Sequence, residues 1–187
     1  MKTGIEKFKN VISDETCDLL IDHIETNMDK AADLKHLANG VDVNNVICRQ
    51  LVLQQNTKLD NLVYESISRT AELYMQQYDT FLATGDTGYQ LRRISGPTRP
   101  HIDNTYDSNH PNKIRNASVI LGLNSDYENG EFHFPIQNFS TTVKRGEAIV
   151  FPVYFLYLHS VDAPIGYRYT INTWLTNGFV PPADLLK

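Results

Sequence analysis

The feature that most constrains the fold is a series of short apolar runs that begins after Gly85. Turn-forming pairs such as Asn129-Gly130 and Arg145-Gly146 separate the runs. Short alternating runs between turn residues are typical of strands in a sandwich, jelly roll or barrel. The runs expected to be strands are GYQLRRIS, NASVILGLN, EFHFP, STTVKR, EAIVFP, YFLYLHSV and YRYTINTWL.

The residues before Gly85 begin with a helical pattern. Ser13 can cap a helix that begins at Asp14, because its hydroxyl can accept a hydrogen bond from a free backbone N–H of the first turn. Apolar residues then recur at helical spacing, and Asn39-Gly40 ends this region. The residues that carry the spacing are Leu19, Leu20, Ile24 and Met28.

The remaining N-terminal residues predict one strand and one more helix. Residues 41–53 are rich in β-branched side chains and predict a strand, and residues 58–80 predict a helix with one apolar face. We expect an α+β, mainly β fold in which the helices pack on one sheet. The length favours a single domain over residues 1–187, with a helical support region (1–84) and a β core (85–180).

The composition narrows the classes of partner. Of the 187 residues, 41% are hydrophobic and 21% are charged, which is typical of an ordinary globular protein. A net charge of −5 argues against a general nucleic-acid binder, which usually carries a basic excess. The start of the chain, MKTGIEKFKN, has no apolar core of a signal peptide, and no run approaches the roughly 20 apolar residues of a membrane span. We therefore expect a cytoplasmic protein without a membrane partner.

Two further features bear on ligands. The two cysteines, Cys17 and Cys48, form neither a disulfide framework nor a C-x-x-C motif, so a thiolate zinc site is not expected. Basic residues cluster around the first motif described below, with few acids among them. The cluster is either a solvated surface or the entrance of a binding site that favours anionic small molecules. Its members are Arg92, Arg93, Arg99, Lys113 and Arg115.

Three residues form a candidate metal site. In a strand, residues two apart point to the same face, so the side chains of His101 and Asp103 in the triplet His101-Ile102-Asp103 converge. His159 ends the apolar run YFLYLHSV, where a buried imidazole needs a partner. Two histidines and one carboxylate are typical of non-haem Fe(II) oxygenases, and zinc hydrolases use a similar set.

Arg168 favours the first of these two classes. A chain reversal about Pro164-Ile165 would pair His159 with Thr170 and Val161 with Arg168. Arg168 would then lie diagonally opposite His159, about 7–8 Å away between backbones. A five-carbon diacid could span that gap, with one end on the metal and its far carboxylate on the guanidinium, while Thr170 adds a hydroxyl.

From about Tyr89 to Leu175 the chain resembles the 2-oxoglutarate/Fe(II)-dependent oxygenase family, especially its prolyl 4-hydroxylase-like branch. The matching pieces are Pro100-His101-Ile102-Asp103, SVILGLNSDYENGEFHFP, VKRGEAIVFP, His159 and YRYTINTWL. The resemblance implies a double-stranded β-helix (jelly roll) core and N-terminal helices that back its sheet. LRRISGPTRPHID is also partly similar to the aspartyl/asparaginyl hydroxylase branch, which leaves the roles of Arg92 and Arg93 open.

The resemblance also implies the cofactors and their ligands. Fe(II) would be held by His101, Asp103 and His159, and 2-oxoglutarate by Arg168, with Thr170 and Tyr89 as further cosubstrate contacts. With O2 as the oxidant, 2-oxoglutarate would be decarboxylated to succinate while a C–H bond is hydroxylated. Ascorbate is a further candidate cofactor.

The substrate stays open between several classes. By analogy alone the first candidate is a prolyl or other peptidyl residue, and the second is a free amino acid or small metabolite. A zinc metallohydrolase with the same His/Asp/His set, or a non-catalytic jelly-roll binding module, are alternatives from other classes. The sequence does not set the oligomeric state.

Other residues compete for roles in the site. Glu131 and His133 share a strand face in GEFHFP and form a rival ligand pair, although pocket lining or surface is the favoured interpretation. The polar loop 104–113 is either a lid over the substrate or a plain solvated loop. The aromatic residues Tyr154, Tyr157 and Trp174 are expected in the core.

Overall fold

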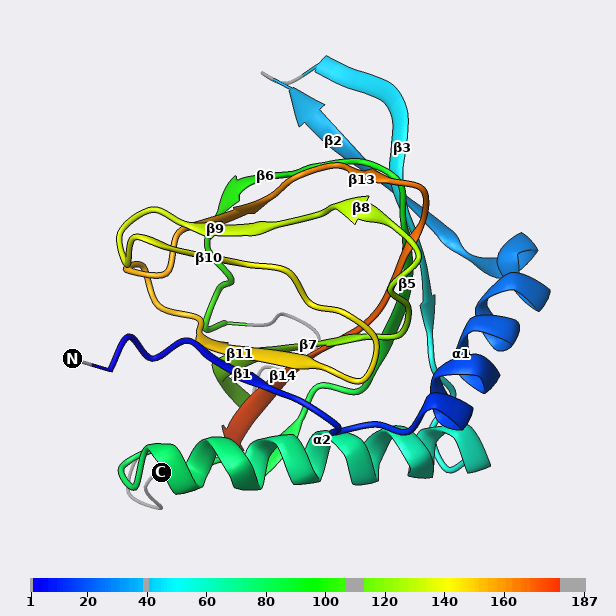
Figure 1. Cartoon of the computed structure of the whole chain (residues 1–187). Helices are drawn as coiled ribbons and strands as arrows, with labels where there is room; N and C mark the ends of the chain where they lie inside the picture. Colours follow the sequence, from blue (N-terminus) through cyan, green and yellow to red (C-terminus); the bar gives the residue numbers. More distant parts are fainter. Residues whose placement is uncertain (1, 39–40, 107–112, 179–187) are drawn as a thin grey trace, which may run out of the picture.

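Two antiparallel sheets face each other in the computed structural model, which describes residues 2–38, 41–106 and 113–178 (Figure 1). The larger sheet has the strand order β1 (Glu6–Phe8), β11 (Ala148–Pro152), β7 (Lys113–Gly122), β14 (Arg168–Gly178), β5 (Gln90–Ile94), β3 (Val41–Val52) and β2 (Ala32–Ala38), with β4 (Gly85–Asp86) also paired to β14. The smaller sheet has the order β10 (Phe139–Thr141), β9 (Phe132–Phe134), β12 (His159–Val161) and β6 (Thr98–His101). A short ladder joins β13 (Pro164–Ile165) to β8 (Glu128–Asn129). The expected mainly β jelly roll is confirmed.

Two helices cover the outer face of the larger sheet (Figure 1). Helix α1 (Asp14–Thr26) begins as predicted, because the Ser13 hydroxyl accepts a hydrogen bond from the backbone N–H of Thr16 at 3.1 Å. Helix α2 (Lys58–Gln77) begins in the same way at Thr57 and ends three residues before the predicted position. Neither of these helices has the length and hydrophobicity that a membrane span requires.

The segment after α1 differs from the prediction. A short 3-10 turn, η1 (Met28–Lys30), ends the helical stretch, and residues 32–38 then form strand β2 rather than more helix. The strand forms because it pairs along β3, where Asp33 lies opposite Arg49 and accepts a 2.8 Å hydrogen bond from its Nε. Helical spacing in the sequence ends at Met28, and residues 32–38 become a strand because they pair with β3.

The run YFLYLHSV also differs from the prediction, because only its last three residues form a strand. A turn closed by the Tyr157 N–H and the Tyr154 carbonyl (2.9 Å) takes up its first half. Tyr154 is 48% exposed, so its expected place in the core is wrong, and Phe155 is 74% exposed. Tyr157 lies partly buried against the core, and its hydroxyl donates to the carbonyl of Thr3 at 3.0 Å.

Strand alternation gives the larger sheet two different faces. Successive side chains of a strand point to opposite faces, and β11 sends Ala148 and Val150 toward the helices but Ile149 and Phe151 toward the smaller sheet. One hydrophobic cluster thus joins helices to sheet, and a second lies between the sheets. Polar side chains of β5 and β14 line the rest of the space between the sheets.

The helix–sheet cluster predicts a stability difference between two neighbouring leucines of α1. Leu20 is 0% exposed and Leu19 is 41% exposed. We expect Leu20→Ala to lower the free energy of unfolding by about 2–5 kcal/mol, because it removes buried methyl groups and leaves a cavity. Leu19→Ala should change it by about 0.5 kcal/mol or less. Urea unfolding followed by circular dichroism measures both, and equal losses would contradict this packing.

Candidate metal centre

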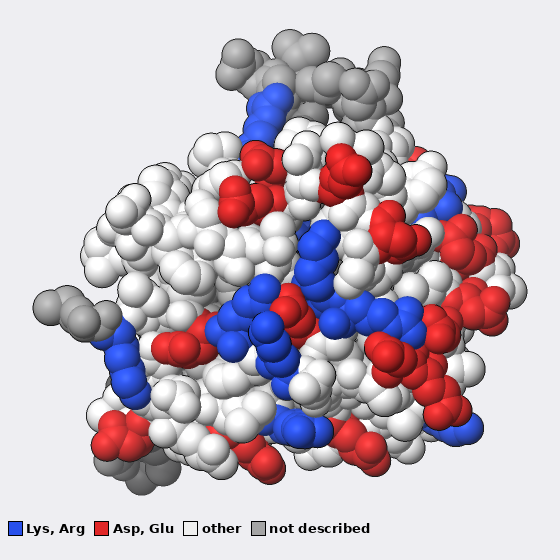
Figure 2. Space-filling model, in the orientation of Figure 1, with Lys and Arg blue, Asp and Glu red and all other residues white. Residues whose placement is uncertain are grey.

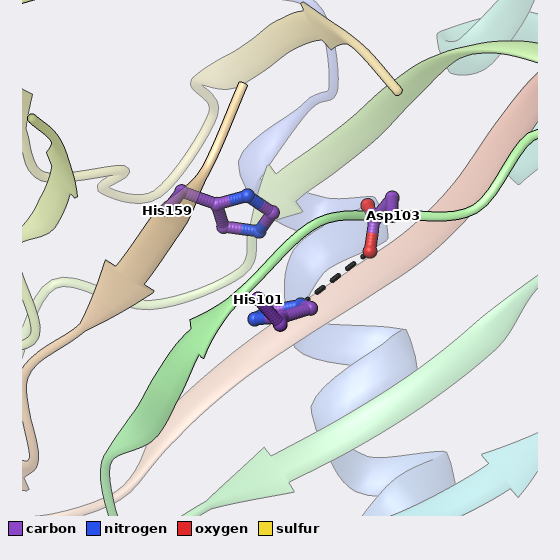
Figure 3. Close-up of side chains that lie close together, drawn as sticks. All are labelled: His101, Asp103 and His159. Carbon is purple, nitrogen blue, oxygen red and sulfur yellow. Dashed lines mark ion pairs between the residues drawn. The ribbon is translucent and has the colours of Figure 1, made fainter. Parts of the chain in front are cut away.

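The three predicted metal ligands meet in the structure. His101 ends β6, Asp103 follows two residues later, and His159 begins β12, where it pairs in register with His101. One ligand atom from each residue lies within 4.8 Å of the others. Figure 3 shows the two imidazoles and the carboxylate gathered around one space, with the ion pair between His101 and Asp103 drawn as a dashed line. A single cation could therefore be approached by all three.

Backbone contacts orient both imidazoles in the same way. Nδ1 of His101 lies 2.9 Å from the carbonyl oxygen of Arg99, and Nδ1 of His159 lies 3.1 Å from that of Tyr157. Since a carbonyl only accepts, Nδ1 carries the proton in each ring and donates it. The lone pair of each Nε2 is then free for a cation, which is the arrangement that metal-bound histidines usually show.

Asp103 is held as a carboxylate by its neighbours. The indole Nε1 of Trp174 donates to its Oδ2 at 3.1 Å, and the Ser118 hydroxyl donates to the same oxygen. Burial alone raises the pKa of Asp103, but these hydrogen bonds, together with His101 and His159, outweigh it and hold the pKa far below its ordinary value. Asp103 is therefore ready to bind a cation without first losing a proton.

The two histidines differ in their electrostatic surroundings. The hydrogen bond to Asp103 raises the pKa of His101, whereas burial lowers the pKa of His159. His159 is only 4% exposed and packs against Phe134 and Phe151. A neutral His159 is the form that ligates a metal.

Arg168 lies on the opposite wall of the same pocket as a buried cation without a counter-ion. It is 2% exposed, and its Nε and Nη1 have no hydrogen-bond partner. Its guanidinium carbon lies 5.1 Å from the ring centroid of Phe132, and no ion pair joins it to a carboxylate in the described part of the chain. Burial lowers the pKa of Arg168 to about 10, so it stays charged at neutral pH. A buried, unpaired charge is costly, and these orphaned donors fit a carboxylate ligand.

The predicted pairing of His159 with Thr170 in one hairpin is wrong. β12 pairs with β6 and β9 of the smaller sheet, whereas β14 pairs with β5 and β7 of the larger sheet. The chain crosses from one sheet to the other through β13, so Arg168 lies opposite Ile94 instead of Val161. His159 and Arg168 still converge because the two sheets face each other. The pocket between them is lined by Arg92, Ile94, Thr98, His101, Asp103, Ile120, Phe132, His159, Val161, Arg168, Thr170, Asn172 and Trp174.

Two predicted cosubstrate contacts have different outcomes. Thr170 is buried and lines the pocket, where its hydroxyl donates to Oδ1 of Asn172 at 2.7 Å. Tyr89 points to the other face of the sheet, into the helix–sheet cluster, and its hydroxyl donates to Asp86 at 2.9 Å. The structure contradicts a cosubstrate contact for Tyr89. Residues two apart along a strand point to the same face, and both Tyr89 and Leu91 point away from the pocket.

Two residues that contact Asp103 were not singled out as functional by the sequence. Trp174 was expected in the core but lines the pocket and fixes Asp103, as Ser118 does. Both stand on strands whose alternate residues are core side chains, such as Leu175 and Val119. The sequence could have indicated that Trp174 lines the pocket, because it lies an even number of residues from Arg168 and Thr170 and so shares their strand face.

The rival pair Glu131 and His133 lies elsewhere. Together with Asp162 it forms a second cluster of potential ligands outside the pocket lining. Nε2 of His133 lies 2.8 Å from Oδ2 of Asp162, and Nδ1 lies 3.0 Å from the Ser140 hydroxyl. These side chains are at least one-third exposed, which agrees with the favoured surface interpretation. Most of the loop 104–113 lies outside the described residues, so the lid expectation stays a prediction.

Comparisons with known proteins agree with the resemblance seen in the sequence. Residues 89–176 match the family model described as the 2OG-Fe(II) oxygenase superfamily. The fold is similar to a viral collagen prolyl hydroxylase from Paramecium Bursaria Chlorella virus-1, solved as a 2OG complex, at a TM-score of 0.70 and 19% identity over 93% of this chain and 96% of that one. The fold is also similar to a Trichoplax adhaerens prolyl hydroxylase, at a TM-score of 0.68 and 15% identity over 93% of this chain and 84% of that one. That protein was solved with a hypoxia inducible factor oxygen degradation domain peptide fragment. A Pseudomonas putida prolyl-4-hydroxylase is similar at a TM-score of 0.64 and 12% identity, over 95% of this chain and 94% of that one. No curated protein matches significantly.

The unpaired guanidinium predicts an unusual effect on stability. In ligand-free protein at neutral pH, Arg168→Met should leave the free energy of unfolding unchanged or raise it by about 1–4 kcal/mol, because an apolar chain of similar length replaces an uncompensated buried charge. The comparison is Arg145→Met, which removes 2.8 Å ion pairs to Asp14 and Asp18 and should lower it by up to about 1 kcal/mol. Chemical unfolding checks both, and a large loss for Arg168→Met alone would show that the guanidinium stabilises the free protein.

The indole contact predicts an effect on metal affinity. Trp174→Phe keeps the ring but removes the donor to Asp103, so we expect Mn(II) to bind roughly 10-fold more weakly, as for other partners of metal ligands. Calorimetric titration measures the affinity. An unchanged dissociation constant would mean that Ser118 alone suffices to orient the carboxylate.

Proposed function

We propose that this chain is an oxygenase that couples 2-oxoglutarate consumption to hydroxylation of its substrate. The match of residues 89–176 to the 2OG-Fe(II) oxygenase superfamily model supports the proposal. One observation carries the proposal: a buried guanidinium, which has no counter-ion among the residues that the structure describes, lines the same pocket as a His/Asp/His set. A metal and a dicarboxylate would each satisfy one wall of the pocket. The donor set fits Fe(II), which prefers two histidines and one carboxylate with its other positions open.

The residues would divide the work as follows. His101, Asp103 and His159 would hold Fe(II), which when bound supplies the activation of O2 and the oxidation of 2-oxoglutarate. Arg168 would bind the distal carboxylate of 2-oxoglutarate through its free N–H groups, in the geometry that guanidinium and carboxylate share. The Thr170 hydroxyl lies on the same wall, and it could donate to the cosubstrate only by turning away from Oδ1 of Asn172, which now accepts its one proton. Trp174 and Ser118 would keep Asp103 ionised and fixed.

The pocket walls would control water and orientation. Three of its apolar lining residues, Ile120, Phe132 and Val161, belong to the cluster between the sheets and are at most 5% exposed. Apolar walls around a charged ligand lower the local dielectric and strengthen the contact with Arg168. The rigid sheets hold both walls at a fixed separation, so one ligand length fits the distance between metal set and guanidinium.

A zinc hydrolase with the same ligands is less consistent with the pocket. Hydrolysis needs a metal-bound water and gives no role to a buried cation on the opposite wall. Keeping Arg168 unpaired costs stability in the free protein, and a bound diacid accounts for that cost.

We further propose that the substrate is a prolyl residue of a peptide. The three structural relatives described above are prolyl hydroxylases, and one was solved with a peptide fragment. A free amino acid or other small metabolite is the second candidate.

The division of roles predicts separable losses. We expect Arg168→Met to weaken 2-oxoglutarate binding at least about 30-fold, because a buried hydrogen-bonded charge pair is lost, while Mn(II) affinity changes about twofold or less. His159→Ala should abolish binding of Mn(II). Anaerobic calorimetry gives both constants, and anaerobic Fe(II) with 2-oxoglutarate should give a visible charge-transfer band in the wild type. Equal losses of metal and cosubstrate affinity in Arg168→Met would contradict its role.

The substrate proposal has its own measurement. Succinate formation should rise when proline-containing peptides are added, and the peptides should gain one oxygen atom by mass spectrometry. Matched peptides with alanine in place of proline serve as the control. Stimulation by free amino acids alone would favour the second candidate, and stimulation by both peptide sets would exclude proline as the target.

A further inference from the structure

A second arginine faces the pocket in the middle of strand β5. Arg92 lies opposite Thr170 of β14 on one side and opposite Gln50 of β3 on the other. Alternation along β5 sends Leu91 into the helix–sheet cluster and Arg92 into the pocket lining. The side chain thus stands beside the proposed cosubstrate site, on the side of β3.

The contacts of Arg92 orient it but leave its charge unbalanced. Its Nε donates to Oε1 of Gln50 at 2.9 Å, and its Nη2 donates to Oε1 of Gln90 at 2.5 Å. Both acceptors are neutral amides, and no ion pair to Arg92 occurs among the described residues. A guanidinium has five N–H donors, so the amides leave three, including those of Nη1. Burial lowers the pKa of Arg92, yet an arginine keeps its charge at neutral pH.

The proposed ligands do not balance this charge either. Fe(II) and 2-oxoglutarate carry equal and opposite charges, so they leave the charge of the pocket lining unchanged. The charged lining residues other than the histidines are Asp103, Arg92 and Arg168, which together carry one net positive charge. Figure 2 shows lysine and arginine side chains gathered near the middle of one face, over the space between the two sheets of Figure 1. Such a field favours approach of an anion.

Arg92 is also placed differently from the cosubstrate anchor. Arg168 pairs with Ile94, two residues along β5, and is almost fully buried, whereas Arg92 is only partly buried. In the proposed function, the distal carboxylate of 2-oxoglutarate lies on Arg168 and the other carboxylate at the metal. Neither carboxylate is left for Arg92.

We propose that Arg92 binds a carboxylate of the substrate, an inference that rests on the proposed function. The two glutamines hold the guanidinium so that its Nη1 edge can take a carboxylate in a planar, bidentate pair. The carboxylate is either an acidic side chain beside the reacting residue of a peptide or the α-carboxylate of a free amino acid. In both cases it would fix the substrate relative to the metal.

The test measures substrate affinity of protein loaded with Mn(II) and saturating 2-oxoglutarate without O2. Two matched pairs of probes separate the sources: the terminally blocked peptides Ala-Pro-Glu and Ala-Pro-Gln, and L-proline with L-prolinamide. We expect the carboxylate form of one pair to bind about 10-fold or more tightly than its amide. The pair that shows the preference identifies the source of the carboxylate.

Variants then assign the preference to Arg92. Arg92→Gln should abolish it while 2-oxoglutarate affinity changes about twofold or less, and Arg92→Lys should keep a reduced preference because it keeps the charge but loses the planar fork. The matched control is Arg93→Gln on the same strand. Arg93 pairs with Glu25 of α1 at 3.0 Å, so its removal should leave the preference intact.

Several results would overturn the inference. These are equal binding of acid and amide in both pairs, no binding of any carboxylate probe, or a preference that survives in Arg92→Gln. A loss of 2-oxoglutarate affinity in Arg92→Gln as large as in Arg168→Met would assign Arg92 to the cosubstrate instead. Failure of the proposed function would show earlier, as absence of Mn(II) and 2-oxoglutarate binding in the wild type.

Discussion

Strand alternation in the larger sheet is the constraint on which the rest of this structure depends. On β14, one set of alternate residues, including Ile171 and Leu175, packs on the helices, and the other set faces the smaller sheet. The helices supply enough apolar contact to hold the sheet by one face. The other face is therefore free to carry polar and charged side chains that would weaken an ordinary core.

The charged side chains on that inner face are balanced only when ligands are bound between them. The smaller sheet contributes the two imidazoles, the segment just after β6 contributes Asp103, and the larger sheet contributes Arg168 and Arg92. Asp103 is satisfied by Trp174, Ser118 and His101, so it does not neutralise either arginine directly. A pocket with one carboxylate, the buried guanidinium of Arg168 and the partly buried guanidinium of Arg92 suits a cation bound together with a dianionic cosubstrate and an acidic substrate.

Local patterns in the sequence predicted much of this arrangement, and long-range pairing accounts for the errors. Neighbouring residues alone predict the cap at Ser13, strand β5 and strand β7. The H-x-D triplet indicates two of the ligands, although β6 ends at His101 and Asp103 lies just beyond the strand. The end of the apolar run YFLYLHSV pointed to His159, and Arg168 was predicted correctly as a pocket residue from a strand register that the structure does not have. Strand β2, by contrast, depends on its partner β3, and a local hairpin could not reveal that β12 and β14 belong to different sheets. The cosubstrate contact of Tyr89 was implied by the resemblance alone, and its side chain lies on the helix side of the larger sheet.

The central claim is that one pocket holds a metal on its His/Asp/His wall and a diacid on its arginine wall. A crystal structure of the protein with Mn(II) and 2-oxoglutarate, with anomalous scattering to locate the metal, tests it most directly. The account predicts direct bonds from the metal to both Nε2 atoms and to the Asp103 carboxylate, with the distal carboxylate on Arg168. Metal bound instead at Glu131, His133 and Asp162, or a diacid away from Arg168, would contradict it.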